Sequence, residues 1–210
     1  MKKYFLNVFP ENRSKNLENF LEKTKKELDK FFKIKMEKPF VFLINSRRDF
    51  DKIRGIKTEK WQVGFAERYN IFIMNLKVYT KESCHKNAKD FWKTLKHEFC
   101  HLYFNKVAKT NRPFWLNEGT ACYLTGQNII KPQKEEVLNI FKYHNKSDSL
   151  IYQLSTFWVR ILIKKFGRNK FCNLIKSING NPGKNFFAAN FRKIYGINYS
   201  KKDFGKLVLR

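Results

Sequence analysis

The stretch His97-Glu98-Phe99-Cys100-His101 decides the fold, together with Trp115-Leu116-Asn117-Glu118-Gly119 a short distance downstream. Residues 88–107 carry apolar side chains at the spacing of an amphipathic helix. On such a helix His97 and His101 lie about 40° and one turn apart, so their imidazoles share a face. The apolar residues cluster on the opposite face, and they are Ala88, Trp92, Leu95, Phe99 and Leu102. We therefore expect this back face to pack on a sheet while the histidines face a cleft.

Two imidazoles one turn apart can bind one metal ion, because zinc–nitrogen bonds are about 2.0–2.1 Å long. Glu98 lies about 100° around the helix from His97, beside the metal and not on it. Sixteen residues separate His101 from Glu118, enough for a helix end, a turn and an antiparallel return. We therefore predict one zinc ion per chain, with His97, His101 and Glu118 as its ligands.

This set of residues suits hydrolysis. Zinc held by two neutral imidazoles and one carboxylate keeps an open position for water, whose pKa it lowers toward about 7. Glu98 is placed to take the proton of that water as general base and to pass it to a leaving amine. Cys100 and Cys122 flank the ligands, and we interpret both as small packing residues.

Two families of zinc proteases do not fit the rest of the chain. A metzincin requires glycine at position 104 and histidine at position 107, where this chain has Phe104 and Val107. The SprT-like proteases take a third histidine from a downstream His-Gly motif. The only downstream histidine is His144, and no glycine follows it.

The chain instead resembles the gluzincins, in particular the small peptidase MA-like proteins and the catalytic core of the alanyl aminopeptidase-type enzymes. Trp115 to Gly119, followed by Ala121 and Tyr123, is similar to the W-L-N-E-G-x-A-x-Y segment that carries their zinc-binding glutamate. The likeness covers roughly Pro39 to Gly167. It implies a zincin-like fold and a zinc metallopeptidase with Glu98 as the catalytic base.

The resemblance suggests two further roles. Tyr152, ahead of an apolar run that ends at Phe166-Gly167, is similar to a tyrosine that stabilises the oxyanion, although a tyrosine in the core is an equal interpretation. Glu67 in Gly64-Phe65-Ala66-Glu67-Arg68 lies where the aminopeptidases bind the substrate's amine, and a solvated turn residue is the alternative. Residues 71–79 should then form the edge strand that pairs with a peptide substrate.

The order of elements predicts an α+β fold in a single catalytic domain. A lobe over residues 1–110 should hold a small mixed sheet and the His97 helix, and an all-helical lobe over residues 111–210 should hold Glu118. The strands are expected at 3–9, 40–44, 61–66 and 71–79. The helices are expected at 14–35, after Ser46 as far as Gly55, from about 83–87 to 107, from Pro113 to 124, and at 133–143, 149–166, 169–178, 186–195 and 201–209.

The formal net charge of +26 is extreme for 210 residues and could attract nucleic acid. Only ten of the 44 basic residues are arginine, however, and the lysines are spread along the chain. We therefore favour a solvated lysine surface and a peptide or protein substrate. The alternative from another class is a zincin-fold binding protein whose basic surface docks nucleic acid or a protein partner, with little or no proteolysis.

The remaining features suggest a cytoplasmic protein. The apolar run from Tyr4 to Phe9 contains Asn7, meets Pro10 and Glu11, and has no small-residue cleavage site typical of a signal peptide. No run is long and apolar enough to cross a membrane. The four cysteines form no C-x-x-C pair, so we expect reduced thiols. Small size alone would suit a toxin-like secreted protease. The sequence carries no signal that identifies the oligomeric state or the substrate.

Overall fold

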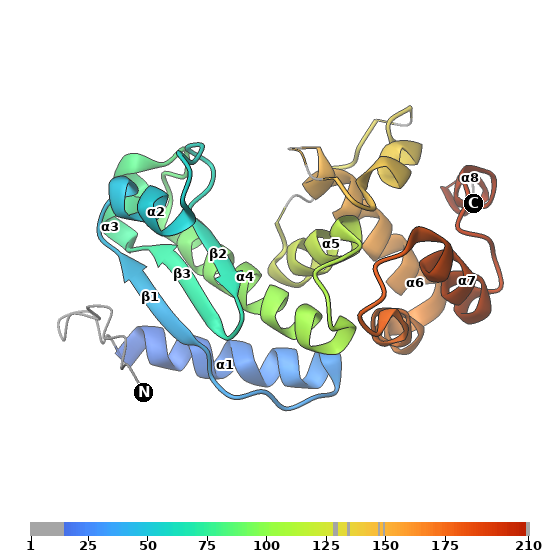
Figure 1. The fold of residues 1–210 in the computed structure, drawn as a ribbon, viewed down its shortest axis with the longest axis horizontal. Coiled ribbons are helices and arrows are strands. Elements are labelled where there is room, and N and C mark those ends of the chain that lie inside the picture. The colour runs from blue at the N-terminus through green and yellow to red at the C-terminus, as the bar shows by residue number, and fades with distance from the viewer. Residues whose placement is uncertain (1–14, 128–129, 134, 147, 149, 209–210) are drawn as a thin grey trace. The chain divides into compact units, whose positions relative to one another are not determined.

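The computed structural model describes residues 15–127, 130–133, 135–146, 148 and 150–208. The strand expected at residues 3–9 lies outside them. Within the described residues the fold is α+β and mostly helical, with one small mixed sheet, as the order of elements predicted. The chain divides into two compact units, residues 1–102 and 103–210, and the boundary falls inside helix α4 (Figure 1).

The sheet of the first unit consists of β1 (Phe40–Ile44), β2 (Gly64–Glu67) and β3 (Asn70–Met74) in the order β1-β3-β2. β1 runs parallel to β3, whereas β2 is antiparallel to β3. The prediction that residues 71–79 form an edge strand is therefore wrong, because β3 is paired on both sides. Among the described strands, β2 is an edge.

The strand expected over 71–79 is also too long. β3 ends at Met74, and α3 (Leu76–Glu82) follows at once. The cause is local: the side chain of Asn75 accepts a hydrogen bond of 2.9 Å from the backbone N–H of Val78 and so caps the helix. Val78 and Tyr79, which extend the apolar run in sequence, form the buried face of this helix.

The two faces of the sheet differ in their packing. Ile71 and Ile73 point to one face and are fully buried. The other face carries three stacked rings, one from each strand, with Phe72 4.8 Å from Phe42 and 4.7 Å from Phe65 between ring centroids. Helix α2 (Arg47–Arg54) packs on this second face. As predicted, Ser46 caps α2 at its start and Gly55 ends it, with a φ of 68°.

Helix α1 (Lys15–Phe32) buries an apolar stripe that ends in Leu28, Phe31 and Phe32. Lys96 of α4 (Ala88–Ala108) donates a hydrogen bond to Glu27 of α1 at 2.6 Å. The expected single apolar face of α4 is only partly correct, because this helix is buried around most of its circumference. Leu95, Phe99 and Leu102 are buried as expected, but so are Cys100, Tyr103 and Phe104, whereas Ala88 is exposed and Trp92 half-buried.

The described elements of the second unit are all helical, as predicted. They are α5 (Phe114–Thr125), the 3-10 helix η2 (Val137–Tyr143), α6 (Ile151–Ile178), α7 (Lys184–Tyr195) and α8 (Lys201–Val208). α6 joins the two helices expected at 149–166 and 169–178 across a break at Gly167, whose φ is 83°. Aromatic side chains fill the core between these helices, including Trp115, Trp158, Phe187, Phe191 and Phe204. Among the described helices, none has the length and apolar character needed to cross a membrane.

Candidate metal site

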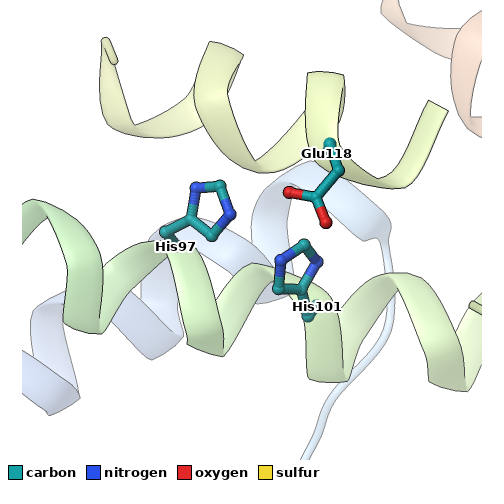
Figure 2. A group of neighbouring side chains, drawn as sticks. All are labelled: His97, His101 and Glu118. Atoms are coloured by element: carbon teal, nitrogen blue, oxygen red, sulfur yellow. The ribbon is translucent and has the colours of Figure 1, made fainter. Parts of the chain in front are cut away.

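One group of side chains in the described part of the chain could hold a metal ion, and it consists of His97, His101 and Glu118 (Figure 2). Each residue offers one ligand atom, and the three atoms lie within 4.8 Å of one another. The imidazole centroids of His97 and His101 are 4.6 Å apart, with the rings nearly perpendicular at 83°. His97 is buried, and the other two are half-buried. The structure thus brings together the three residues that the sequence predicted as ligands.

The spacing and chemistry of this group fit a metal. A tetrahedral ion with bonds of about 2.1 Å holds its ligands about 3.4 Å apart, so small side-chain rotations would bring the three atoms to that arrangement. Two imidazoles and one carboxylate are donors that zinc accepts readily. The partial burial of all three limits competition from bulk water. The residues present therefore suit a resident metal ion.

Helix α4 carries both histidines, and contacts with α3 hold this helix in place. The hydroxyl groups of Tyr79 and Thr94 share a buried hydrogen bond of 2.8 Å. Burial raises the pKa of Tyr79 to about 12, so the phenol stays protonated at neutral pH. Thr94 precedes His97 by one helical turn. The bond therefore fixes α4 immediately before its first predicted ligand.

Glu98 is buried beside strand β2, with a relative exposure of 7%. Gly64, the first residue of β2, makes room for it: a Cβ added there would lie 3.2 Å from Glu98 Cγ and 3.4 Å from Glu98 Oε1. A glycine inside a strand commonly marks such a close approach. The predicted catalytic carboxylate is thus held between helix α4 and the edge strand of the sheet.

Two contacts position helix α5. The amide nitrogen of Asn117, which is 4% exposed, donates to the side-chain oxygen of Asn105 near the end of α4 at 3.3 Å and to the Asn111 carbonyl at 3.1 Å. The neighbouring Gly119 contacts α6 so closely that an added Cβ would lie 2.6 Å from the Ser155 carbonyl oxygen. Glu118 lies between these two anchors in sequence. In the sequence, Asn117 and Gly119 are identifiable only as parts of a motif, whereas their contacts with Asn105 and Ser155 depend on the folded structure.

The two weaker site predictions concern Tyr152 and Glu67, which lie on different elements. Tyr152 is half-buried in the first turn of α6, one turn before the Gly119–Ser155 contact. Glu67 is the exposed last residue of β2. Because side chains alternate along a strand, Glu67 points to the face opposite Gly64 and Glu98. The structure does not bring Glu67 together with Glu98.

The remaining candidates are not members of the metal group. Cys100 and Cys122 are buried and in no disulfide, and no cysteine belongs to the metal group found among the described residues. His144, the other downstream histidine, is 3% exposed and bonds through Nε2 to the Pro182 carbonyl at 3.0 Å. Its surroundings are aromatic, including Phe187 at 5.4 Å. His144 is therefore a packed core residue of the second unit.

Comparison of the chain with protein-family models, curated proteins and solved structures gives no significant match.

Proposed function

We propose that the protein is a zinc-dependent metallopeptidase of the gluzincin type, with a zincin-like fold. The observation that carries the proposal is the convergence of His97, His101 and Glu118, with Glu98 one residue beyond the first ligand. A structural cluster of buried polar residues has no need of a second carboxylate at that position. A hydrolytic metal site needs one, because a general base must contact the attacking water without occupying a ligand position.

The proposed roles divide between the metal and the chain. Bound at this site, zinc would supply a Lewis acid that polarises a carbonyl and makes water more acidic. Glu98 accepts a proton from the attacking water and delivers it to the amine that leaves. Burial beside β2 limits the rotamers of Glu98, so its carboxylate is oriented before substrate binds.

The edge strand β2 is the proposed docking element for the peptide. Among the described residues it is paired with β3 alone, so its outer backbone groups can pair with an extended peptide. Gly64 of this strand lies against Glu98, which supports delivery of a peptide bond to the catalytic carboxylate. This assigns to β2 the role that the sequence suggested for residues 71–79.

Tyr152 is the proposed donor to the oxyanion. A phenol hydrogen bond strengthens as negative charge develops on the carbonyl oxygen. The support is the position of Tyr152 on α6, one turn before Ser155. Ser155 contacts Gly119, the residue that follows Glu118. Glu67 points to the face of β2 opposite Glu98, which weakens the case for its binding a substrate amine. We therefore propose that peptides with free and with blocked N-termini are accepted alike.

The test combines metal analysis with peptide digestion. The purified protein is expected to hold about one zinc per chain and to cleave members of a peptide library, and a chelator should abolish cleavage. Glu98→Gln should retain zinc while cleavage falls by about 10²–10⁴-fold. Asp90→Asn on the same helix is the matched acid-to-amide control and should retain both zinc and cleavage.

Several results would contradict the proposal. Failure to bind zinc supplied in excess would remove its basis. Iron as the resident metal would point to different chemistry, because two histidines and one carboxylate also form non-haem iron sites. Zinc binding without cleavage of any peptide, N-blocked or free, would favour the alternative of a binding protein.

A further inference from the structure

Acidic residues are distributed unevenly along this basic chain. Residues 15–102 contain 21 basic and 12 acidic side chains, whereas residues 150–208 contain 12 basic and a single acidic one, Asp203. The frequency of basic residues is similar in the two stretches. A general bias toward lysine therefore does not account for the difference, because the second stretch has no excess of basic residues and instead lacks acidic ones.

The basic side chains of the second stretch are all exposed. The first unit pairs several of its lysines with acids, for example Lys25 with Asp29 and Lys96 with Glu27. In the described part of residues 150–208, the ion pair found is Lys206 with Asp203. Helices α6, α7 and α8 therefore present positive charge to solvent with almost no local compensation.

Five of these cations lie close in sequence to Phe166 of α6 or to Tyr195 of α7. The ring centroid of Phe166, the residue before the break at Gly167, lies 4.7 Å from that of Tyr195 in the last turn of α7. The exposed basic residues within three positions of either ring along the chain form what we name the kink cluster, and they are Lys164, Lys165, Arg168, Arg192 and Lys193. Uncompensated like charges on two contacting segments repel one another, so a polyanion that neutralises them would bind favourably.

The character of the surface favours nucleic acid over a membrane. A helix that lies on a membrane needs an exposed apolar face. In residues 150–208 the large exposed apolar side chains are only Leu150 and Phe186 among the described residues. Exposed amides accompany the cations instead, including Asn169 and Asn173 on α6. Lysine, arginine and asparagine are side chains that contact phosphate and sugar oxygens.

We propose that the kink cluster and the adjoining basic residues of α6–α8 bind the sugar–phosphate backbone of a nucleic acid, without reading its base sequence. This second activity does not rest on peptidase chemistry, because none of these residues belongs to the metal site. It would hold the protein, and any substrate bound to the same nucleic acid, at one place.

The experiment measures the binding of full-length protein to a 20-base-pair DNA duplex and to a mixed-sequence single-stranded RNA over a range of salt concentrations. In one variant the five cluster residues are changed to glutamine. The matched control changes Lys15, Lys23, Lys26, Lys30 and Lys35 of the α1 region to glutamine, which removes the same charge from another surface. Both variants are checked for folding by thermal unfolding.

The cluster variant is expected to bind more than tenfold more weakly at low salt. For the duplex, its plot of log affinity against log salt should be shallower by up to about 4, because each neutralised phosphate contributes about 0.9. The control variant should change that slope by less than about 1. If the five-residue variant fails to fold, the triple variant Lys164→Gln, Lys165→Gln, Lys193→Gln should still lower the slope by up to about 3.

Three outcomes would overturn the proposal. Equal weakening in the cluster and control variants would show that total charge alone governs binding. Retention of the protein on anionic vesicles, without affinity for either nucleic acid, would identify a membrane surface. Displacement of the nucleic acid by polyglutamate at an equal concentration of charge would identify a surface for acidic protein. If the wild-type protein binds nucleic acid as expected but cleaves no peptide, the result would count against the peptidase proposal alone.

Discussion

Gly119 of α5 lies against the backbone of Ser155 in α6, so that an added Cβ would meet the Ser155 carbonyl oxygen at 2.6 Å and carbon at 2.7 Å. Such distances are shorter than any normal contact, and backbone atoms cannot rotate away as a flexible side chain can. The two helices can therefore approach this closely only with glycine at position 119. Because Glu118 precedes Gly119, the same contact sets where the carboxylate stands.

Gly119→Ala is expected to lower the free energy of unfolding. Overpacking typically costs about 1–3 kcal/mol, and the better helix propensity of alanine offsets at most about 1 kcal/mol of this. Zinc affinity should fall as well, because α5 must shift and carry Glu118 with it. Urea unfolding and zinc titration measure the two effects. Gly205→Ala is the control, since no atom lies within 4 Å of its added Cβ, and it should leave stability unchanged or raised.

The sequence predicted that His97, His101 and Glu118 lie together, and part of that information is local. His97 and His101 are four residues apart on one helix, so helical geometry alone fixes their relation. Glu118 required more, namely a motif around it and a plausible return of the chain. The Ser46 cap and the Gly55 helix end were also predicted correctly, because each is a property of a few adjacent residues.

The errors arose from one local signal that was missed and from nonlocal contacts. Tyr79 extends an apolar run that looks like a strand, but the local Asn75 cap begins a helix there, and the nonlocal hydrogen bond to Thr94 holds Tyr79 in it. The central position of β3 depends on which strands pair, and a run of apolar residues does not encode its neighbours. Gly64 gave a usable signal, since glycine in a strand often marks a close approach, but its partner Glu98 lies 34 positions away.

Gly64→Ala should impair catalysis without removing the metal. The new Cβ would lie 3.2 Å from Glu98 Cγ, so the side chain of Glu98 must move by a few tenths of an ångström. We expect a fall in kcat of about tenfold with little change in KM, since misplacement of a catalytic group by about 1 Å costs about 100-fold. Steady-state kinetics and metal analysis test this. Ala66→Gly alters the same strand without crowding Glu98, so an equal fall in kcat in that variant would argue against a positioning role.

Zinc should stabilise the fold whether or not the protein cleaves peptides. A ligand at 100 times its dissociation constant adds about 2.7 kcal/mol to the free energy of unfolding. For a chain of this size that corresponds to a rise in Tm of about 5–11 °C after zinc is restored to chelator-treated protein. His101→Ala should abolish this rise, whereas His85→Ala should preserve it. A zinc-dependent rise that survives His101→Ala would place the metal elsewhere.

Stability should fall as the pH drops below about 6.5, because His144 is buried. Burial is the main cause that lowers its pKa in the folded protein, and the positive charges of Lys184 and Arg112 act in the same direction, while the hydrogen bond to Pro182 opposes them. Among the described residues no hydrogen-bond partner lies at Nδ1, so a second ring proton would find none there. In the unfolded chain His144 therefore binds a proton near pH 6.5, whereas in the folded chain it binds that proton only at a lower pH.

The contribution of neutral His144 to the free energy of unfolding is thus fully present above pH 6.5. It is lost between pH 6.5 and the lowered pKa of His144 in the folded protein, at up to about 1.4 kcal/mol per pH unit. The backbone N–H of Phe114 donates to the His144 carbonyl at 3.2 Å, so we expect protonation of His144 to destabilise the start of helix α5 as well. Urea unfolding of metal-depleted protein between pH 5 and pH 8 measures it. His144→Gln should flatten the profile relative to wild type and to the control His85→Gln. Identical slopes in all three proteins would show that His144 titrates alike in the folded and unfolded states.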